Sequence, residues 1–223
     1  MDVDKTLHQE AGWKYLLLAL GAFAGLGIEA LYAFWLEPLI YGRALIDFTT
    51  ADNIRHWIIT CVSWGIVGFV LIRIGKEKAG FDVFENGEKL SAWRWIAAAG
   101  FVVFSFAADW FDWSGFKCLK EFQYNGWLKF IFQYIYYMFE TALYSLIIIY
   151  GQKAFEKWTK HKNIPWGGIL CALTWGAGHI LTKGSVITGL WTTLAGFMFG
   201  AVYLLLNRDA KKAYLFLFLM LVL

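Results

Sequence analysis

The stretch FQYIYYMFETALYSLIIIY, residues 132–150, is the most informative part of the chain for its fold class. It lies within an apolar segment, 128–150, that is long enough to cross a hydrocarbon core of about 30 Å as an α-helix. Glu140 is the only acidic residue in that segment. An ionisable side chain at mid-bilayer costs at least about 2.5 kcal/mol. The stretch therefore predicts a membrane helix and identifies Glu140 as a residue whose position needs a reason.

The rest of the chain has the same character. Of its 223 residues, 59% are hydrophobic and 17% are charged, whereas a soluble domain carries about 25% charged residues. Six full apolar segments and one shorter segment are visible, at 13–36, 54–74, 93–110, 128–150, 164–181, 186–206 and 213–223. We expect an all-α membrane protein, a polytopic bundle of six to seven transmembrane helices that forms a single domain over residues 1–223.

The distribution of Lys and Arg predicts an orientation. If the segments alternate, fourteen of these residues lie on the side of the N-terminus and six on the opposite side. The positive-inside rule then predicts a multi-pass protein of the cell membrane with a cytoplasmic N-terminus. Membrane lipid is the expected surrounding, and a net charge of +3 gives no indication of a nucleic-acid partner. The three cysteines show no CxxC spacing, so neither a disulfide framework nor a cysteine zinc site is predicted.

Glu140 belongs to a polar stripe on its helix. At 3.6 residues per turn, one face carries Gln133, Tyr136, Tyr137, Glu140 and Tyr144. Lipid offers these groups no partners, so the stripe is expected to face protein or a hydrated cavity. The alternative is a buried carboxyl that is satisfied by tyrosines and only fixes helix packing.

His179 is the second ionisable group within an apolar segment. Small residues share its helix face at four-residue spacing, and the segment 186–206 carries a matching face; the two sets are Gly168, Ala172 and Gly176, and Thr188, Thr192, Gly196 and Gly200. Small residues let two helix backbones approach closely. We therefore expect the two segments to pack tightly around His179, with Trp175 one turn before it. A lone histidine in a helix is more often a satisfied structural group than a ligand.

Three further acidic residues have simpler interpretations. Glu29 has Gly21 and Gly25 nearby, and we expect it to pair across a helix interface. Asp109 and Asp112 lie among tryptophans at a segment end, where we expect them to be solvated.

The stretches YYMFETALYS (136–145), TWGAGHI (174–180) and GLWTTLAGFMFGAVYLLLNR (189–208) resemble the CPBP (Abi) group of intramembrane proteases. That group includes the type II CAAX prenyl endopeptidases and bacteriocin-processing or self-immunity proteins. The resemblance covers about residues 125–210, which form the family-like core. Glu140 matches the family's glutamate, and Trp175-x-x-x-His179 keeps the spacing of its FxxxH motif, with Trp in place of Phe. Gly200-Ala-Val-Tyr203 matches the end of its glycine-rich helix.

The chain also departs from the family pattern. The second glutamate of the EExxxR motif is absent, since Phe139 and Thr141 flank Glu140. The arginine position falls on Tyr144 or Ser145. The later HxxxN motif has no counterpart in 213–223.

The resemblance implies an endopeptidase that hydrolyses a peptide bond of a membrane-associated peptide, lipidated or not. Glu140 would activate water, and His179 would hold that water, stabilise the oxyanion or bind a metal. The expected cavity lining is Tyr136, Tyr137, Tyr144, Trp175 and Thr192. A catalytic zinc takes about three protein ligands, and Glu140 and His179 supply two, so no metal is assigned.

Two other classes stay open. The first is a catalytically degenerate family member that acts as a peptide-binding, bacteriocin-immunity or scaffold membrane protein. The second is a transporter or channel, which would need a continuous polar path across several helices. The predicted orientation places His179 roughly 22 Å from the cytoplasmic face, whereas CAAX-type substrates approach from the cytosol. The site therefore opens outward, or the orientation is inverted.

Overall fold

The computed structural model describes residues 2–85 and 87–223, and side chains from Gly12 onward with the exception of residue 86. Within these ranges the chain forms helices and no strand. In chain order they are α1 (Asp2–Leu31), a π-helical turn (Tyr32–Leu36), α2 (Glu37–Tyr41), a 3-10 turn (Leu45–Asp47), α3 (Thr50–Ala79), α4 (Ala92–Asp112), α5 (Lys117–Thr159), α6 (Trp166–Cys171), a second π-helical turn (Ala172–Gly176), α7 (Ala177–Lys183), α8 (Val186–Leu205) and α9 (Ala210–Val222). The all-α prediction is confirmed, and each apolar segment coincides with one of these helices or with a helix that a π turn interrupts.

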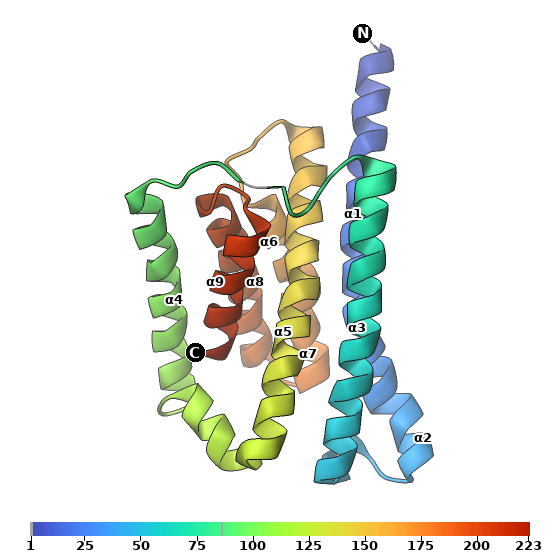
Figure 1. Ribbon diagram of the computed structural model, residues 1–223, viewed down its shortest axis with the longest axis vertical. Coiled ribbons are helices and arrows are strands. Elements are labelled where there is room, and N and C mark those ends of the chain that lie inside the picture. The colour runs from blue at the N-terminus through green and yellow to red at the C-terminus, as the bar shows by residue number, and fades with distance from the viewer. Residues whose placement is uncertain (1, 86) are drawn as a thin grey trace.

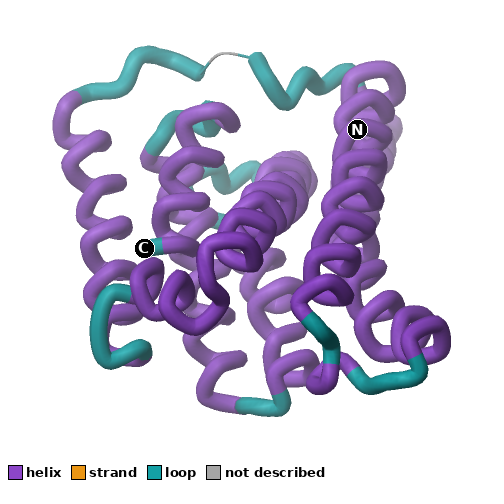
Figure 2. Tube along the Cα trace, turned by 60° about the horizontal axis from the view of Figure 1, so that its bottom comes forward, coloured by secondary structure: helices purple, strands orange, loops and turns teal. Residues whose placement is uncertain are grey.

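The helices run up and down, so the connections gather at two opposite ends (Figures 1 and 2). Helix α1 descends from the N-terminus, and α3 returns beside it. Helix α5 rises through the centre, with α1 and α3 on one side and α6, α8 and α9 on the other (Figure 1). We call the end that carries α2 the lower end and the end that carries the loop 80–91 the upper end.

The second half of α5 is the core of the bundle. Nearly every side chain from Glu140 to Ala154 is buried, on all faces of the helix. A helix that is apolar all round can be stable only where other elements enclose it. Here α1 and α3 cover one side and α6, α8 and α9 the other, so Ile147 and Ile148 have no exposed surface.

The first half of α5 is bent at Gly126. This residue adopts φ 69° and ψ 169°, which is not helical. A side chain is disfavoured at this positive φ, and glycine is not. The bend folds the turns from Lys117 to Asn125 back towards the helix that follows, and hydrogen bonds then join the two parts: Asn125 donates to Gln133 at 2.6 Å.

Glycines allow α6 and α8 to touch through their backbones. A Cβ placed on Gly200 would lie 2.3 Å from the Cα of Gly168, and one on Gly196 would lie 2.8 Å from the backbone nitrogen of Ala172. Likewise, a Cβ on Gly176 would lie 2.6 Å from the Cα of Thr193. The close packing that the small residues predict is therefore confirmed.

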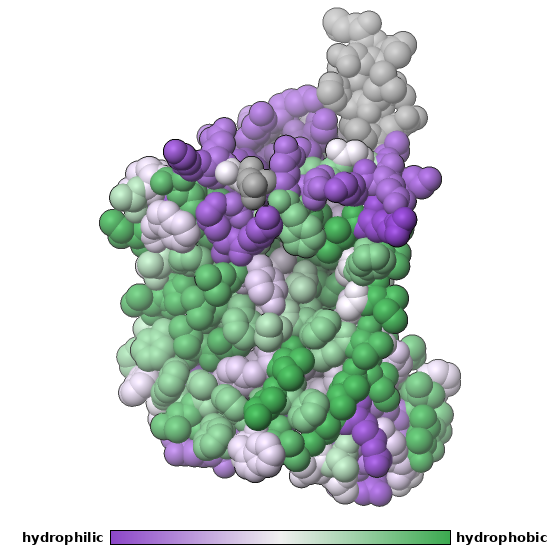
Figure 3. Space-filling model, viewed as in Figure 1, coloured by the Kyte–Doolittle hydropathy of each residue, from purple (hydrophilic) through white to green (hydrophobic). Residues whose placement is uncertain are grey.

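The outer surface is strongly apolar. Figure 3 shows a broad hydrophobic surface below a hydrophilic upper end. Helix α4 is the extreme case, because it buries only Ala98 and exposes large side chains along most of its length. Among the described residues, four helical stretches are long and apolar enough to cross a membrane: Gly12–Tyr41, Thr50–Ala79, Ala92–Asp112 and Val186–Leu205. These features indicate association with a membrane.

The glycine contact gives a first prediction. Gly200→Ala should destabilise the bundle by about 1–3 kcal/mol, because the new methyl group collides with backbone atoms of α6 that cannot turn away. The matched control is Gly100→Ala on α4, where a Cβ has no neighbour within 4 Å. Thermal unfolding in detergent measures both variants. Equal unfolding temperatures for the two would contradict the contact.

Candidate functional site

Glu140 lies in the buried part of α5 and is 8% exposed. Its Oε1 accepts a hydrogen bond of 2.9 Å from the indole nitrogen of Trp175. A buried carboxyl needs such a donor, because an unpartnered one would cost several kcal/mol. The donor comes from a residue that sequence analysis placed in the same site.

Trp175 reaches this position from a π-helical turn. The backbone N–H of Ala177 bonds to the carbonyl of Ala172, five residues before it. Such turns are rare and are frequent at functional sites. Trp175 is itself almost fully buried, so its indole is held firmly against α5.

The same tryptophan holds His179. The Nδ1 atom of His179 lies 2.8 Å from the carbonyl oxygen of Trp175. A carbonyl oxygen only accepts, so Nδ1 carries the proton in this contact, and the Nε2 of a neutral ring keeps its lone pair. The two rings also pack edge to face, with centroids 4.7 Å apart. Trp175 therefore links Glu140 to His179, with a different group bonded to each.

Tyr144 supports this arrangement by packing. Its ring stacks on Phe199 of α8 and contacts the ring of Trp175, each at a centroid distance of 5.0 Å. Its hydroxyl donates to the carbonyl of Leu217 on α9 at 3.1 Å. Tyr144 is completely buried, so its polar group is committed to α9 while its ring supports Trp175.

The remaining predicted lining residues, Tyr136, Tyr137 and Thr192, bond to or pack on different parts of the bundle. Thr192 donates to the carbonyl of Gly176 at 2.8 Å and so stabilises the π turn that carries Trp175. Tyr136 packs on Trp64 of α3, with centroids 4.8 Å apart. Tyr137 donates to Glu121 at 2.8 Å, which directs its hydroxyl towards the bent lower part of α5.

Sequence analysis missed Glu121. This carboxylate is 3% exposed and accepts hydrogen bonds of 2.8–3.0 Å, donated by Gln133, Tyr134 and Tyr137. Part of the predicted polar stripe thus serves a second buried carboxylate. The available signal was Gly126, a helix breaker between Glu121 and the stripe.

Sequence analysis also missed a histidine between two carboxylates. The Nδ1 of His56 lies 2.7 Å from Oε2 of Glu37, and its Nε2 lies 3.6 Å from Oε1 of Glu29. Glu29 therefore pairs across a helix interface, as expected, but with a partner on α3 that the glycine pattern could not identify. Asp109 forms an ion pair with Lys117 at 3.1 Å.

No metal centre is supported. Across residues 2–85 and 87–223, no group of three or more His, Cys, Asp or Glu side chains is arranged to hold a metal ion.

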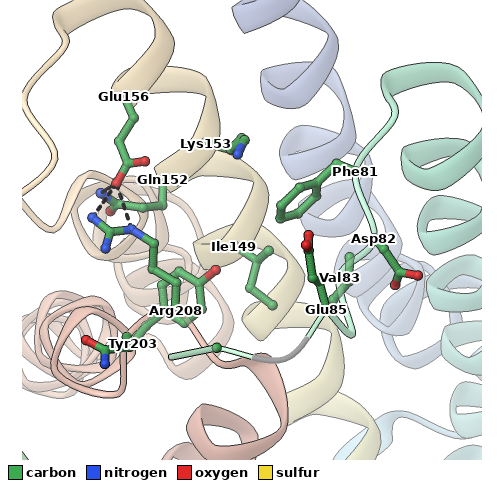
Figure 4. Close-up of a pocket in the computed structure, with 12 residues that line it drawn as sticks. Phe81, Asp82, Val83, Glu85, Ile149, Gln152, Lys153, Glu156, Tyr203 and Arg208 are labelled. Carbon is green, nitrogen blue, oxygen red and sulfur yellow. Dashed lines mark hydrogen bonds and ion pairs between the residues drawn. The ribbon is translucent and has the colours of Figure 1, made fainter. Parts of the chain in front are cut away.

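A cavity of about 170 Å³ lies at the upper end, away from Glu140 and His179 (Figure 4). Its charged lining comes from the loop 80–91, from α5 and from Arg208, which donates to Glu156 at 2.8 Å. Burial lowers the pKa of Lys153 there. The hydrogen bond from Lys76 holds the pKa of Asp82 below its ordinary value. None of the predicted site residues lines this cavity.

Comparison with known proteins adds no further constraint on this arrangement. No family model matches the chain, no curated protein matches it in sequence, and no solved structure matches its fold.

Proposed function

We propose that the protein is an intramembrane endopeptidase of the CPBP type, which cleaves a peptide bond of a membrane-associated peptide. The observation that carries the proposal is the pair of hydrogen bonds made by Trp175, one to Glu140 and one to His179. One residue thereby fixes a buried carboxyl and an imidazole relative to each other. Such a pair is the minimum that water-dependent hydrolysis needs from side chains.

The roles follow from the hydrogen bonds. Glu140 would take a proton from a water molecule and pass it to the amine that leaves when the C–N bond breaks. His179 has Nδ1 committed to Trp175. Its Nε2 would therefore bind the same water or the developing oxyanion. Trp175 acts as the positioning residue for both.

We further propose that the protein lies in a cell membrane with a cytoplasmic N-terminus and six to seven spans. The alternation of the helices and the apolar exterior support this placement (Figures 1 and 3). So does the concentration of Lys and Arg in the loops of the upper end. The spans beyond the four apolar stretches would be α5, α6 with α7, and the shorter α9.

A second candidate is a catalytically degenerate member that binds a peptide, as an immunity or scaffold protein does. One observation favours it: Oε1 of Glu140 is already bonded to the Trp175 indole, and that donor alone explains why a carboxyl is tolerated there. The two candidates differ in what they require of Glu140, since only hydrolysis needs it to accept a proton.

Glu140→Gln separates the candidates. Glutamine keeps the shape and still accepts from Trp175, but it cannot take a proton from water. For an endopeptidase we expect cleavage to fall at least about 100-fold. The measurement is mass spectrometry of new peptide N-termini in membranes from cells that express either protein. Glu121→Gln, on the same helix, is the control. If the new peptide N-termini were equally abundant with wild type and with Glu140→Gln, the endopeptidase proposal would be excluded.

Trp175→Phe tests the positioning role. It removes the indole donor and keeps most of the aromatic packing. A hydrogen bond to a charged group contributes about 1.5–3 kcal/mol, so cleavage should fall roughly 10- to 100-fold. The unfolding temperature should fall as well, because the buried Glu140 carboxyl loses its donor. Phe199→Leu on α8 is the control for altered packing around the same ring. A wild-type cleavage rate in Trp175→Phe would exclude the positioning role.

Orientation is tested with single cysteines. The three native cysteines are first replaced by alanine, and then either Ile46→Cys in the lower loop or Asn163→Cys in the upper loop is added. A membrane-impermeant maleimide applied to intact cells should label position 46 at once and position 163 only after permeabilisation. The reverse pattern would invert the orientation.

A further inference from the structure

Three titratable side chains from three helices meet at the lower end of the bundle. Glu29 lies on α1, Glu37 on α2 and His56 on α3. His56 is 4% exposed and Glu37 is 3% exposed, whereas the side chain of Glu29 is 35% exposed. Each ring nitrogen of His56 faces a different carboxylate, at 2.7 Å for Glu37 and 3.6 Å for Glu29.

The number of protons on the His56 ring decides how many of the two carboxylates it can bond to. A neutral imidazole carries one N–H, which serves one carboxylate and leaves the other facing a lone pair. A second proton on the ring makes both nitrogens donors. The contacts of His56 are therefore complete only when the cluster holds an additional proton.

Two buried polar atoms next to His56 are unpartnered. Oε1 of Glu37 and Oγ1 of Thr60 have no hydrogen-bond partner within the described part of the chain. Thr60 follows His56 by one helical turn and is completely buried. Buried polar atoms are nearly always paired, and exceptions call for an explanation. Here they leave a free carboxylate oxygen on Glu37, the residue that contacts Nδ1 of His56, and a free hydroxyl one turn after His56.

Other charges near His56 are engaged with one another. Asp52, one turn earlier on α3, pairs with Arg43 and Arg55 at 3.6 and 3.5 Å. On the adjacent π turn, the Tyr32 hydroxyl is bonded to Ser63. The groups that face the ring itself are thus Glu29 from α1 and Glu37 from α2. From α5, Tyr136 packs on Trp64, which follows His56 on α3 by about two turns.

Trp64 of α3 connects the helix of Glu29 to the helix of Glu140. On α1, the carbonyl of Gly25, one turn before Glu29, accepts a hydrogen bond of 2.9 Å from the indole of Trp64, and the Trp64 ring packs on Tyr136 with centroids 4.8 Å apart. Tyr136 precedes Glu140 by one turn of α5. Glu29 and Glu140 therefore each lie one helical turn from a residue that contacts Trp64.

We propose that Glu29, Glu37 and His56 form a proton-binding site, and that Glu29 couples the occupancy of this site to Glu140 and His179. The use of that proton in peptide hydrolysis rests on the proposed function. The site and its coupling do not, because they follow from contacts that exist without substrate. Coupling between two binding sites is reciprocal, so a change at either end must be felt at the other.

The test follows the ring nitrogens directly. The chain has four histidines, His8, His56, His161 and His179, so ¹⁵N-histidine labelling of the full-length protein in nanodiscs yields a small set of ring signals. Each signal is assigned by a His→Gln variant. Titration with pH then reports the midpoint of each ring in wild type, in Glu29→Gln and in Glu37→Gln.

We expect both variants to change the proton affinity of His56 by about fivefold or more, a typical coupling between sites. Glu29→Gln should also change that of His179. Glu121→Gln is the control, since this buried carboxylate bonds to Gln133, Tyr134 and Tyr137 and to neither ring. It should leave both midpoints at their wild-type values.

A wild-type midpoint for His56 in both variants, or for His179 in Glu29→Gln, overturns the proposal. If Glu29→Gln does not yield folded protein, His56→Gln replaces it: the His179 midpoint must then change, and constancy overturns the coupling. The endopeptidase is judged separately, by cleavage in Glu140→Gln. If the histidine midpoints do not respond but cleavage depends on Glu140, only the proton-site proposal is overturned. If the midpoints respond but cleavage does not depend on Glu140, only the endopeptidase proposal is overturned.

Discussion

The enclosure of α5 between Glu140 and Ala154 constrains everything around it. This part of the helix is almost wholly buried, so its large polar side chains need partners from neighbouring elements. Tyr150 donates to Leu71 of α3, and Gln152 accepts from the backbone of Gly167 at the start of α6. Tyr144 and Glu140 do the same with α9 and with the π turn before α7. These pairings decide where the surrounding helices sit along α5, and apolar contacts fill the space between them.

A π-helical turn lies next to each of the two polar sites, the candidate site at Glu140 and the cluster around His56. The turn Ala172–Gly176 contains Trp175, and the turn Tyr32–Leu36 ends directly before Glu37. The first is stabilised from outside by Thr192, which bonds to the Gly176 carbonyl. The second precedes Pro38, whose missing N–H would interrupt a regular α-helix at that point in any case. In both places a helix gives up regular hydrogen bonds, and an ionisable side chain lies within three residues of the irregularity: His179 after the first turn and Glu37 after the second. That association is common at functional sites.

The helices could be predicted because apolar runs of this length have few other solutions. Glu140 and His179 could be identified because an ionisable group inside such a run is costly. The direction of neighbouring side chains could not be predicted. Tyr137 shares the helix face of Glu140, yet its hydroxyl bonds to Glu121, because the bend at Gly126 brings that carboxylate into reach. Periodicity states which residues share a face, and it contains no information on what stands opposite that face.

The sequence by itself determined the helical class, the order and length of the apolar segments, and the close approach of α6 to α8 through glycines. Each of these depends on residues near one another along the chain or on a regular spacing. The tertiary structure alone decided that Trp175 joins Glu140 to His179, and that Glu29 and Glu37 face the two ring nitrogens of His56. Those relations join helices that are distant in sequence, and they depend on π turns and rotations of individual helices. Side-chain packing in three dimensions sets such rotations, because no local pattern distinguishes one rotation of a helix from the next.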